Sequence, residues 1–279
     1  MAQSVRSWEP HLPSLSAERD VLVCECLGQG PDQGSWGTCD PRDGGGDGDG
    51  AMTLDRHAED LGRVIREAFG GDAQIDLAGF SLGGRIGLAA LAAAAGESAP
   101  PLSIRRMHLT GVGAERDGFG EAVVQSWRDA LGDHGGEDDE EEARRLRAFA
   151  WSAVLATHSP HFLSRQGPDR IRTWVDGICS QSTAGGMRSL LRGTHGEEDE
   201  WSPAGMARRI SQAPEAGRTR GRICVGGDDR MVPPGQALRL GELLGWGEES
   251  VRLFRECGHA VPTEMGRAWR EDLLDFLAD

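Results

Sequence analysis

The residues with the clearest chemical potential are Gly79-Phe80-Ser81-Leu82-Gly83-Gly84, which contain the pattern Gly-x-Ser-x-Gly. An apolar run at 74–80 predicts a strand before the serine, and small and apolar residues at 82–95 predict a helix after it. A serine on a sharp strand-to-helix turn takes a strained backbone conformation, and small residues two positions away leave room for it. The helix would aim its N-terminal amides at the site, so the N–H of Leu82 could donate to a developing oxyanion. The pattern therefore predicts a nucleophilic serine.

A serine hydroxyl needs a base that takes its proton and an acid that orients the base. Two downstream motifs carry such groups, namely Gly226-Gly227-Asp228-Asp229 and Gly258-His259. Each follows or ends an apolar run that predicts a strand, at 222–227 and 251–254. Loops at the carboxyl ends of strands in an open α/β sheet meet in one crevice, so these residues can lie together although they are far apart in sequence.

The elements that would position these groups alternate along the chain. Strands are predicted at 20–27, 74–80, 104–112, 222–227 and 251–254, and helices at 54–69, 82–95, 234–244 and 263–277. This alternation predicts an α/β fold with a parallel sheet covered by helices on both faces. Residues 115–215 instead show helical spacing throughout and predict a lobe of four or five helices. The four tryptophans of the lobe either form its own core, the default interpretation, or line an apolar lid.

With nucleophile, acid and histidine in this chain order, the sequence resembles the α/β-hydrolase fold superfamily. Further matching segments are Glu25-Cys26-Leu27-Gly28-Gln29-Gly30 and Leu54–Leu61. The resemblance implies a mostly parallel, doubly wound sheet. It also implies a core of residues 1–114 and 215–279 with an inserted helical cap at 115–214.

By the same resemblance, Ser81 is the nucleophile, His259 the base and Asp229 the acid. Asp228 is the rival acid, but family members usually show Gly-x-x-Asp followed by x-x-Val-Pro, which favours Asp229. The implied function is a serine hydrolase that cleaves a small carboxylic ester or related acyl compound through an acyl-enzyme. Its partner would be a small-molecule substrate, with no cofactor and no metal.

One family feature is absent from the sequence. Members normally begin with a strand ending in His-Gly, whose loop supplies a second oxyanion N–H, followed by a tryptophan and a proline-bearing helix start. Ser7-Trp8-Glu9-Pro10-His11-Leu12-Pro13 resembles the later part, and only Met1–Arg6 precede it. We expect either a sequence that begins downstream of its natural start or a degraded paralogue, and the intact set of Ser81, Asp229 and His259 favours the first.

Two other functions remain open. Arg85 lies four residues after Ser81, where a lyase resembling the menaquinone-pathway synthase would hold a substrate carboxylate and use the triad as a base. The simpler interpretation of Arg85 is an ordinary arginine on a helix surface. The other alternative is a non-catalytic binding protein that keeps the pocket without the oxyanion loop.

Composition narrows the class of protein. The chain has 30 basic residues, all arginine, and 45 acidic ones, a net charge of −15 that argues against nucleic-acid binding. Its longest apolar run, Ile86–Ala95, is too short to span a membrane. Six scattered cysteines predict reduced thiols and a cytoplasmic protein, although the short N-terminus leaves organellar targeting open. The sequence leaves the oligomeric state open.

Three patterns resemble metal sites without completing one. Cys24 and Cys26 lack a second pair, the Asp- and Gly-rich loop at 31–51 lacks ligands in a calcium register, and His158 and His161 lack a third ligand. Another histidine of the lobe, His195, is expected to line a pocket or lie on the surface. His57 is expected on the surface or in packing.

Overall fold

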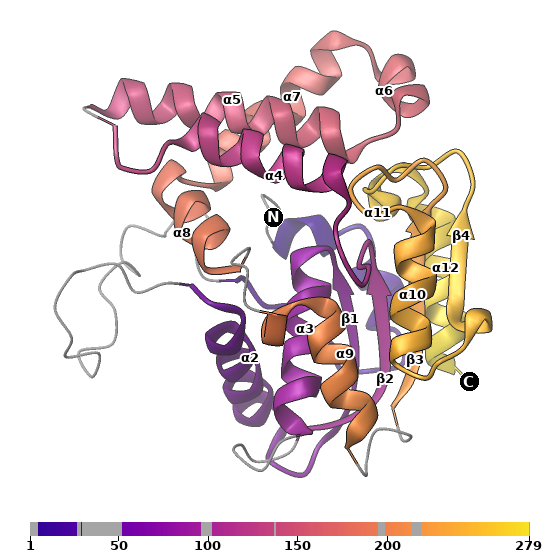
Figure 1. The fold of residues 1–279 in the computed structure, drawn as a ribbon. Helices are drawn as coiled ribbons and strands as arrows, with labels where there is room; N and C mark the ends of the chain where they lie inside the picture. The colour runs from indigo at the N-terminus through magenta and orange to yellow at the C-terminus, as the bar shows by residue number, and fades with distance from the viewer. Residues whose placement is uncertain are drawn as a thin grey trace, which may run out of the picture. The chain divides into compact units, whose positions relative to one another are not determined.

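The computed structural model describes residues 5–26, 29, 52–95, 102–136, 138–194, 199–213 and 219–278 (Figure 1). The chain divides into two compact units. The helical unit is drawn from Met1–Thr53, Val123–Val154 and Gln166–Gly196, and the sheet unit from Leu54–Ala122, Leu155–Arg165 and Glu197–Asp279. The predicted division into a core and a cap at 115–214 stays a prediction.

A parallel sheet of four strands lies in the sheet unit, in the order β1-β2-β3-β4. The strands are β1 (Gln74–Phe80), β2 (Ser103–Thr110), β3 (Arg220–Gly226) and β4 (Val251–Phe254). All neighbours run in the same direction, so the carboxyl ends of the strands share one edge of the sheet. The predicted strands at 74–80 and 251–254 have these bounds, and the other two differ by one or two residues.

Helices cover both faces of this sheet. Leu77 of β1 faces α3 (Leu82–Ala94), where a Cβ on Gly87 would lie 2.6 Å from its side chain. Leu77 is paired in register with Met107 of β2. The next residue of β2, His108, contacts Asp272 of α12 (Gly266–Ala278). Since successive side chains of a strand point to opposite faces, α3 and α12 cover opposite faces, as the sequence predicts.

The remaining helices of this unit have local sequence signals at their ends. They are α2 (Leu54–Phe69), α6 (Pro160–Gln166), α9 (Pro203–Gln212), α10 (Pro234–Leu243) and α11 (Val261–Glu264). Prolines begin α6, α9 and α10, where the missing N–H costs nothing.

The single helix predicted at 263–277 is wrong, because the chain leaves helical conformation at Met265 and separates α11 from α12.

The strand predicted at 20–27 is also wrong over its described residues, 20–26. None of them belongs to the sheet, and Val21 and Leu22 are each 37% exposed. An apolar run becomes a strand only when a neighbour completes its backbone hydrogen bonds. Within the described ranges no strand pairs with this run.

The helical unit contains short turns near its start, η1 (Val5–Trp8) and α1 (Leu12–Leu15), and longer helices after them. These are α7 (Pro168–Gln181), α8 (Ala184–Thr194) and most of α4 (Gly118–Leu131) and α5 (Asp139–Thr157). Trp127 packs edge-on against Phe149 at 5.7 Å between ring centroids, and both are buried. Trp127 is therefore a core residue. From α4 to α9 the described chain has six α-helices, one more than the largest number predicted.

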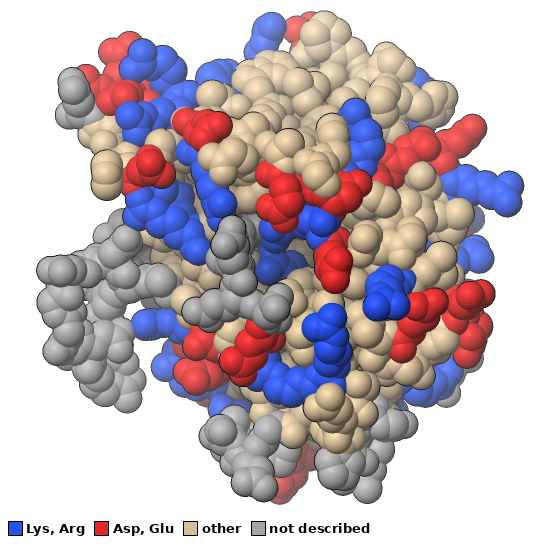
Figure 2. Space-filling view, viewed as in Figure 1, with Lys and Arg blue, Asp and Glu red and all other residues tan. Residues whose placement is uncertain are grey.

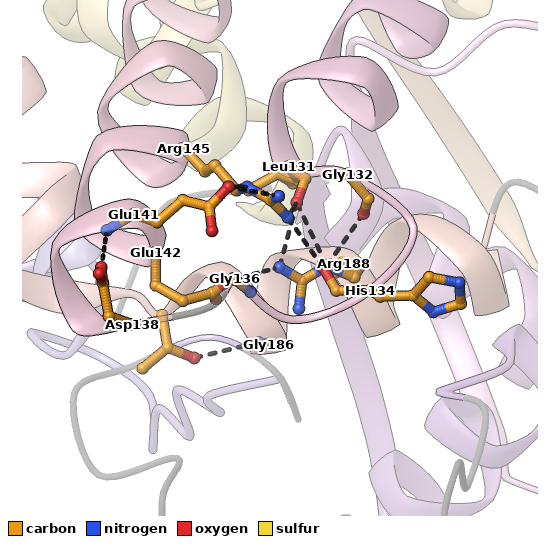
Figure 3. Close-up of polar contacts among 11 residues, drawn as sticks. Leu131, Gly132, His134, Gly136, Asp138, Glu141, Glu142, Arg145, Gly186 and Arg188 are labelled. Carbon is orange, nitrogen blue, oxygen red and sulfur yellow. Dashed lines mark hydrogen bonds and ion pairs between the residues drawn. The ribbon is translucent and has the colours of Figure 1, made fainter.

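Two arginines close the end of α4 (Figure 3). The Arg188 guanidinium donates to the carbonyl oxygens of Leu131 and Gly132, both at 3.0 Å. Arg145 donates to the carbonyl oxygen of His134 at 2.8 Å. The last carbonyls of a helix have no partner within it and carry partial negative charge, so arginines stabilise this terminus. Carboxylates of the first turn of α5 offset the charge of these partly buried arginines, through Arg188–Glu142 at 2.8 Å and Arg145–Glu141 at 2.7 Å.

Charge of both signs is distributed over the face seen in Figure 2, where arginine and carboxylate side chains are interspersed. The acidic excess of the sequence therefore does not gather into one field of a single sign on this face. In the part of the chain that the structure describes, no helix combines the length and the apolar character needed to cross a bilayer.

Candidate active site

Ser81 sits between β1 and α3 in a strained backbone conformation, with φ 51° and ψ −115°. A non-glycine residue at positive φ persists only where its surroundings impose it. A Cβ on Gly79 would lie 2.6 Å from the backbone of Gly84, and one on Gly84 would lie 2.6 Å from Val112. A Cβ on Gly83 would meet nothing within 4 Å. The crowding that demands glycine therefore falls on Gly79 and Gly84, one residue later than the Gly-x-Ser-x-Gly pattern suggests.

The turn is fixed to the neighbouring strand. The backbone N–H of Ser81 donates to the carbonyl oxygen of Thr110 at 2.8 Å, which joins the ends of β1 and β2. Leu82 begins α3, so its N–H is one of the first-turn amides that have no partner inside the helix. Such amides attract negative charge at a helix N-terminus. The position of Leu82 is thus compatible with the predicted oxyanion donor.

The structure brings Ser81, His259 and Asp229 together at this edge of the sheet. His259 Nε2 lies 3.0 Å from Ser81 Oγ, and His259 Nδ1 lies 2.8 Å from Asp229 Oδ2. The histidine is 4% exposed and the aspartate 3%. Each ring nitrogen therefore has its own partner, with the hydroxyl on one side and the carboxylate on the other.

Geometry also separates the two rival aspartates. The second carboxylate oxygen of Asp229 accepts the backbone N–H groups of Met231 and Val232, at 2.9 and 2.8 Å. These bonds hold the carboxylate in place. Asp228 is exposed, and its backbone N–H donates to the carbonyl oxygen of Cys257 at 2.8 Å. Only Asp229 of this pair contacts His259 within hydrogen-bond distance among the contacts of the described residues.

Contacts that the sequence analysis missed hold the imidazole. Gly111 follows β2 with φ 64°, and a Cβ there would lie 2.8 Å from His259 Cε1. The ring of Phe80 lies 5.3 Å from the imidazole centroid. A Cβ on Gly226 would lie 2.1 Å from the carbonyl oxygen of Gly258. The sequence does show a glycine at the end of each of these two strands, Gly111 after β2 and Gly226 in β3. It does not show which group approaches that glycine.

Arg85, on the first turns of α3, is partly buried. Burial and, to a smaller extent, the charge of Arg116 lower the pKa of its guanidinium to about 9, although Glu121 opposes the shift. Arg116 itself pairs with Glu121 at 3.0 Å. The guanidinium groups of Arg85 and Arg116 thus lie near one another in the sheet unit, and the carboxylate of Glu121 offsets part of their positive charge.

The only described group of three side chains with metal-ligand atoms close together is His108, Cys224 and Asp272. The imidazole Nε2, the thiol sulfur and one carboxylate oxygen are each 3.3 Å apart. Burial, with Asp272 beside it, raises the pKa of the Cys224 thiol well above its ordinary value, and the thiol donates to the carboxylate of Asp272. Asp272 also pairs with Arg222 at 3.2 Å. We interpret the group as a hydrogen-bonded network that holds α12 against β2 and β3.

This network predicts how stability depends on pH. Burial lowers the pKa of His108 below its ordinary value of 6.5, although the hydrogen bond with Asp272 opposes the shift. Below that pH the unfolded chain binds a proton that the folded chain refuses, so the free energy of unfolding falls as pH falls. We expect urea unfolding between about pH 7 and about pH 5 to show a steeper fall for the wild type than for His108→Gln. Equal slopes of unfolding free energy against pH would contradict the role given to His108. The lowered pKa of His57 also contributes to the slope, but it does so equally in both proteins and cancels in the comparison.

The other described residues considered from sequence are not among the hydrogen-bond partners of Ser81, His259 and Asp229. His57 is 4% exposed on α2, which supports packing over surface, and burial lowers its pKa. His158 stacks on Phe162 at 5.6 Å and lies 3.2 Å from the hydroxyl of Thr157. Cys24 is exposed. His195 and the loop at 31–51 lie outside the described residues.

A family model of the alpha/beta hydrolase fold matches residues 1–264. Together with the parallel sheet and the serine at its strand-to-helix turn, this match shows that the chain belongs to the α/β-hydrolase fold family, as the sequence resemblance implies. No curated protein matches the chain in a sequence comparison.

Solved structures similar to the chain share its fold at low identity. One is a thermophilic esterase from Thermogutta terrifontis with malate bound, with TM-score 0.66, 17% identity, 99% of this chain covered and 85% of that chain. Another is the enol-lactonase from Burkholderia xenovorans LB400, with TM-score 0.68, 16% identity and coverages of 100% and 88%. A third is MenH from S. aureus, with TM-score 0.65, 16% identity and coverages of 100% and 90%. At identities of 16–17% these likenesses show the fold that the chain shares with these proteins.

Proposed function

We propose that the chain is a serine hydrolase that cleaves a small carboxylic ester or a related acyl compound. The observation that carries this proposal is the hydrogen-bonded series from Ser81 Oγ to His259 Nε2, at 3.0 Å, and from His259 Nδ1 to Asp229 Oδ2, at 2.8 Å. A serine becomes a nucleophile when a base lies within this reach and an acid orients the base. The esterase and the enol-lactonase among the similar structures are compatible with such a substrate.

The geometry assigns each group a step. Ser81 Oγ attacks the acyl carbon while His259 Nε2 takes the hydroxyl proton. Asp229 accepts from the Nδ1–H and stabilises the imidazolium. The N–H of Leu82 donates to the carbonyl oxygen as it becomes negative. The tetrahedral intermediate collapses, the bond to the leaving alkoxide breaks, and His259 returns the proton to it. Water then attacks the acyl-enzyme with His259 again as the base, which releases the acid and restores Ser81.

Labelling with a fluorophosphonate probe tests this proposal directly. The folded wild-type chain should be labelled on Ser81, located by peptide mass, and should hydrolyse short-chain aryl esters, while heat-denatured protein should do neither. A folded wild type that is not labelled and does not hydrolyse these esters would contradict the proposed hydrolase function and favour the non-catalytic alternative.

A second candidate is the lyase in which the triad acts as a base. The observation that favours it is the partly buried guanidinium of Arg85, one helical turn after Ser81, with Arg116 nearby. A desolvated guanidinium binds a carboxylate more strongly than an exposed one does, because less water competes. MenH from S. aureus is among the similar structures.

Arg85→Ala separates the two candidates. If Arg85 holds a substrate carboxylate, we expect the KM for an anionic cyclohexadiene acid to rise by about tenfold or more, since a charged hydrogen bond contributes about 1.5–3 kcal/mol. The KM for a neutral aryl ester should change less than about threefold. Arg63→Ala is the matched control, because Arg63 is exposed on α2 and pairs only locally with Asp60. An unchanged KM for the anionic compound would remove the lyase.

A further inference from the structure

Glu264, at the end of α11, gathers three hydrogen-bond donors. Its Oε1 accepts the backbone N–H of Ser159 at 2.9 Å and that of Gly258 at 3.1 Å. Its Oε2 accepts the hydroxyl of Ser159 at 2.6 Å. Ser159 is 1% exposed, so its donors have no access to bulk water and depend on this carboxylate.

These bonds surround His259 on both sides. Gly258, directly before the histidine, is held by Glu264, and Ala260, directly after it, donates its N–H to the carbonyl oxygen of Thr157 at 2.9 Å. The last residue of α5 and the connection to α6, residues 157–159, are therefore fixed to the backbone on either side of the imidazole. The approach is close, since a Cβ on Gly258 would lie 2.5 Å from the nitrogen of Ser159.

None of the three partners of Glu264 is a reacting group, and the carboxylate touches neither Ser81 nor Asp229 in the contacts of the described residues. Its effect must pass through the backbone of the loop at 257–260. That loop sets where the Nε2 of His259 lies relative to Ser81 Oγ. A misplacement of about 1 Å in a catalytic group can cost about a hundredfold in rate.

We propose that Glu264 is a positioning residue, which locks the loop of His259 to residues 157–159 and so holds the imidazole between Ser81 and Asp229. This inference rests on the proposed hydrolase. In Glu264→Gln, an amide NH2 replaces one of the two acceptor oxygens. If it replaces Oε1, the bonds from the backbone N–H groups of Ser159 and Gly258 are both lost, and if it replaces Oε2, the bond from the Ser159 hydroxyl is lost. An unsatisfied buried donor is costly, so the loop is expected to shift or loosen.

Steady-state kinetics of aryl ester hydrolysis test the proposal. Glu264→Gln should lower kcat by about tenfold or more with KM changed less than about threefold, and Ser159→Ala, which removes one of the three bonds, should lie between it and the wild type. Glu264→Asp, which keeps the charge, should recover part of the loss. Glu271→Gln is the control, because Glu271 is exposed on α12 and its ion pair within the described ranges is with Arg267, one turn away. A variant that is folded by its unfolding midpoint and retains the wild-type kcat would overturn the inference.

A second measurement does not depend on turnover. The proton that His259 Nδ1 shares with Asp229 should give a downfield NMR signal, identified by its loss in Asp229→Asn. Glu264→Gln should shift or broaden this signal and Glu271→Gln should leave it unchanged. If the wild type neither hydrolyses esters nor reacts with a fluorophosphonate, the proposed function fails, and the NMR signal still decides the positioning. An unaltered signal in folded Glu264→Gln would overturn the inference.

Discussion

Ser81→Ala is expected to lower the turnover of an aryl ester by about 10⁶-fold, since loss of the nucleophile removes most of the catalysis of a serine triad. The fluorophosphonate label should disappear with it. The KM of any residual activity should stay near that of the wild type, because alanine removes an atom that acts in the transition state. Assays with a short-chain aryl ester at saturating concentration measure the effect.

Ser211→Ala is the matched control for this change. Ser211 lies exposed on α9 in the same unit, and within the described part of the chain its hydroxyl donates to the carbonyl oxygen of Arg208. The control should keep wild-type turnover and labelling. A folded Ser81→Ala protein with more than about a tenth of wild-type turnover would show that the activity does not come from this serine.

Asp229→Asn is expected to lower kcat by about 10⁴-fold. An amide at this position offers the Nδ1–H of His259 a group that can turn its NH2 toward the ring, so the imidazole loses the tautomer that accepts the serine proton. The two backbone N–H groups of Met231 and Val232 would still hold the side chain, so the fold should survive. Kinetics at saturating substrate, with circular dichroism as the check of folding, measure the effect.

The neighbouring aspartate supplies the control. Asp228→Asn makes the same chemical change one residue earlier, on an exposed side chain, and should alter kcat by less than about threefold. If Asp228→Asn were the damaging variant and Asp229→Asn the harmless one, the acid would be the rival residue. The structural assignment would then be wrong.

Sequence periodicity was sufficient where an element is defined by its own residues. The helix at 54–69 and the strands at 74–80 and 251–254 have the predicted bounds, because apolar spacing marks the element and glycine or charged residues mark its ends. The chain order of the serine, the aspartates and the histidine also pointed to the residues that the structure brings together. Choosing Asp229 over Asp228 needed the family pattern as well.

The rest depends on contacts between distant residues. The run at 20–26 is as apolar as a buried strand, but whether it becomes one depends on a neighbour that its own residues do not encode. The break at Met265 follows from α11 staying against the loop of His259 while α12 packs on the sheet. The residues around Gly111 and Glu264 do not indicate their roles. Gly111 contacts His259 from a distant part of the sequence, and Glu264 bonds the backbone of Gly258 six residues before it.

The placement of Ser81, Asp229, His259 and Glu264 within one compact unit has an evolutionary consequence. Residues 123–154 and 166–196 belong to the other unit, and none of them supplies a partner in the hydrogen bonds that join the described serine, histidine and aspartate. Selection could then diversify those helices at little risk to the reaction centre. Recombination that swaps them between homologues is a practical route to chimeric catalysts built on this scaffold.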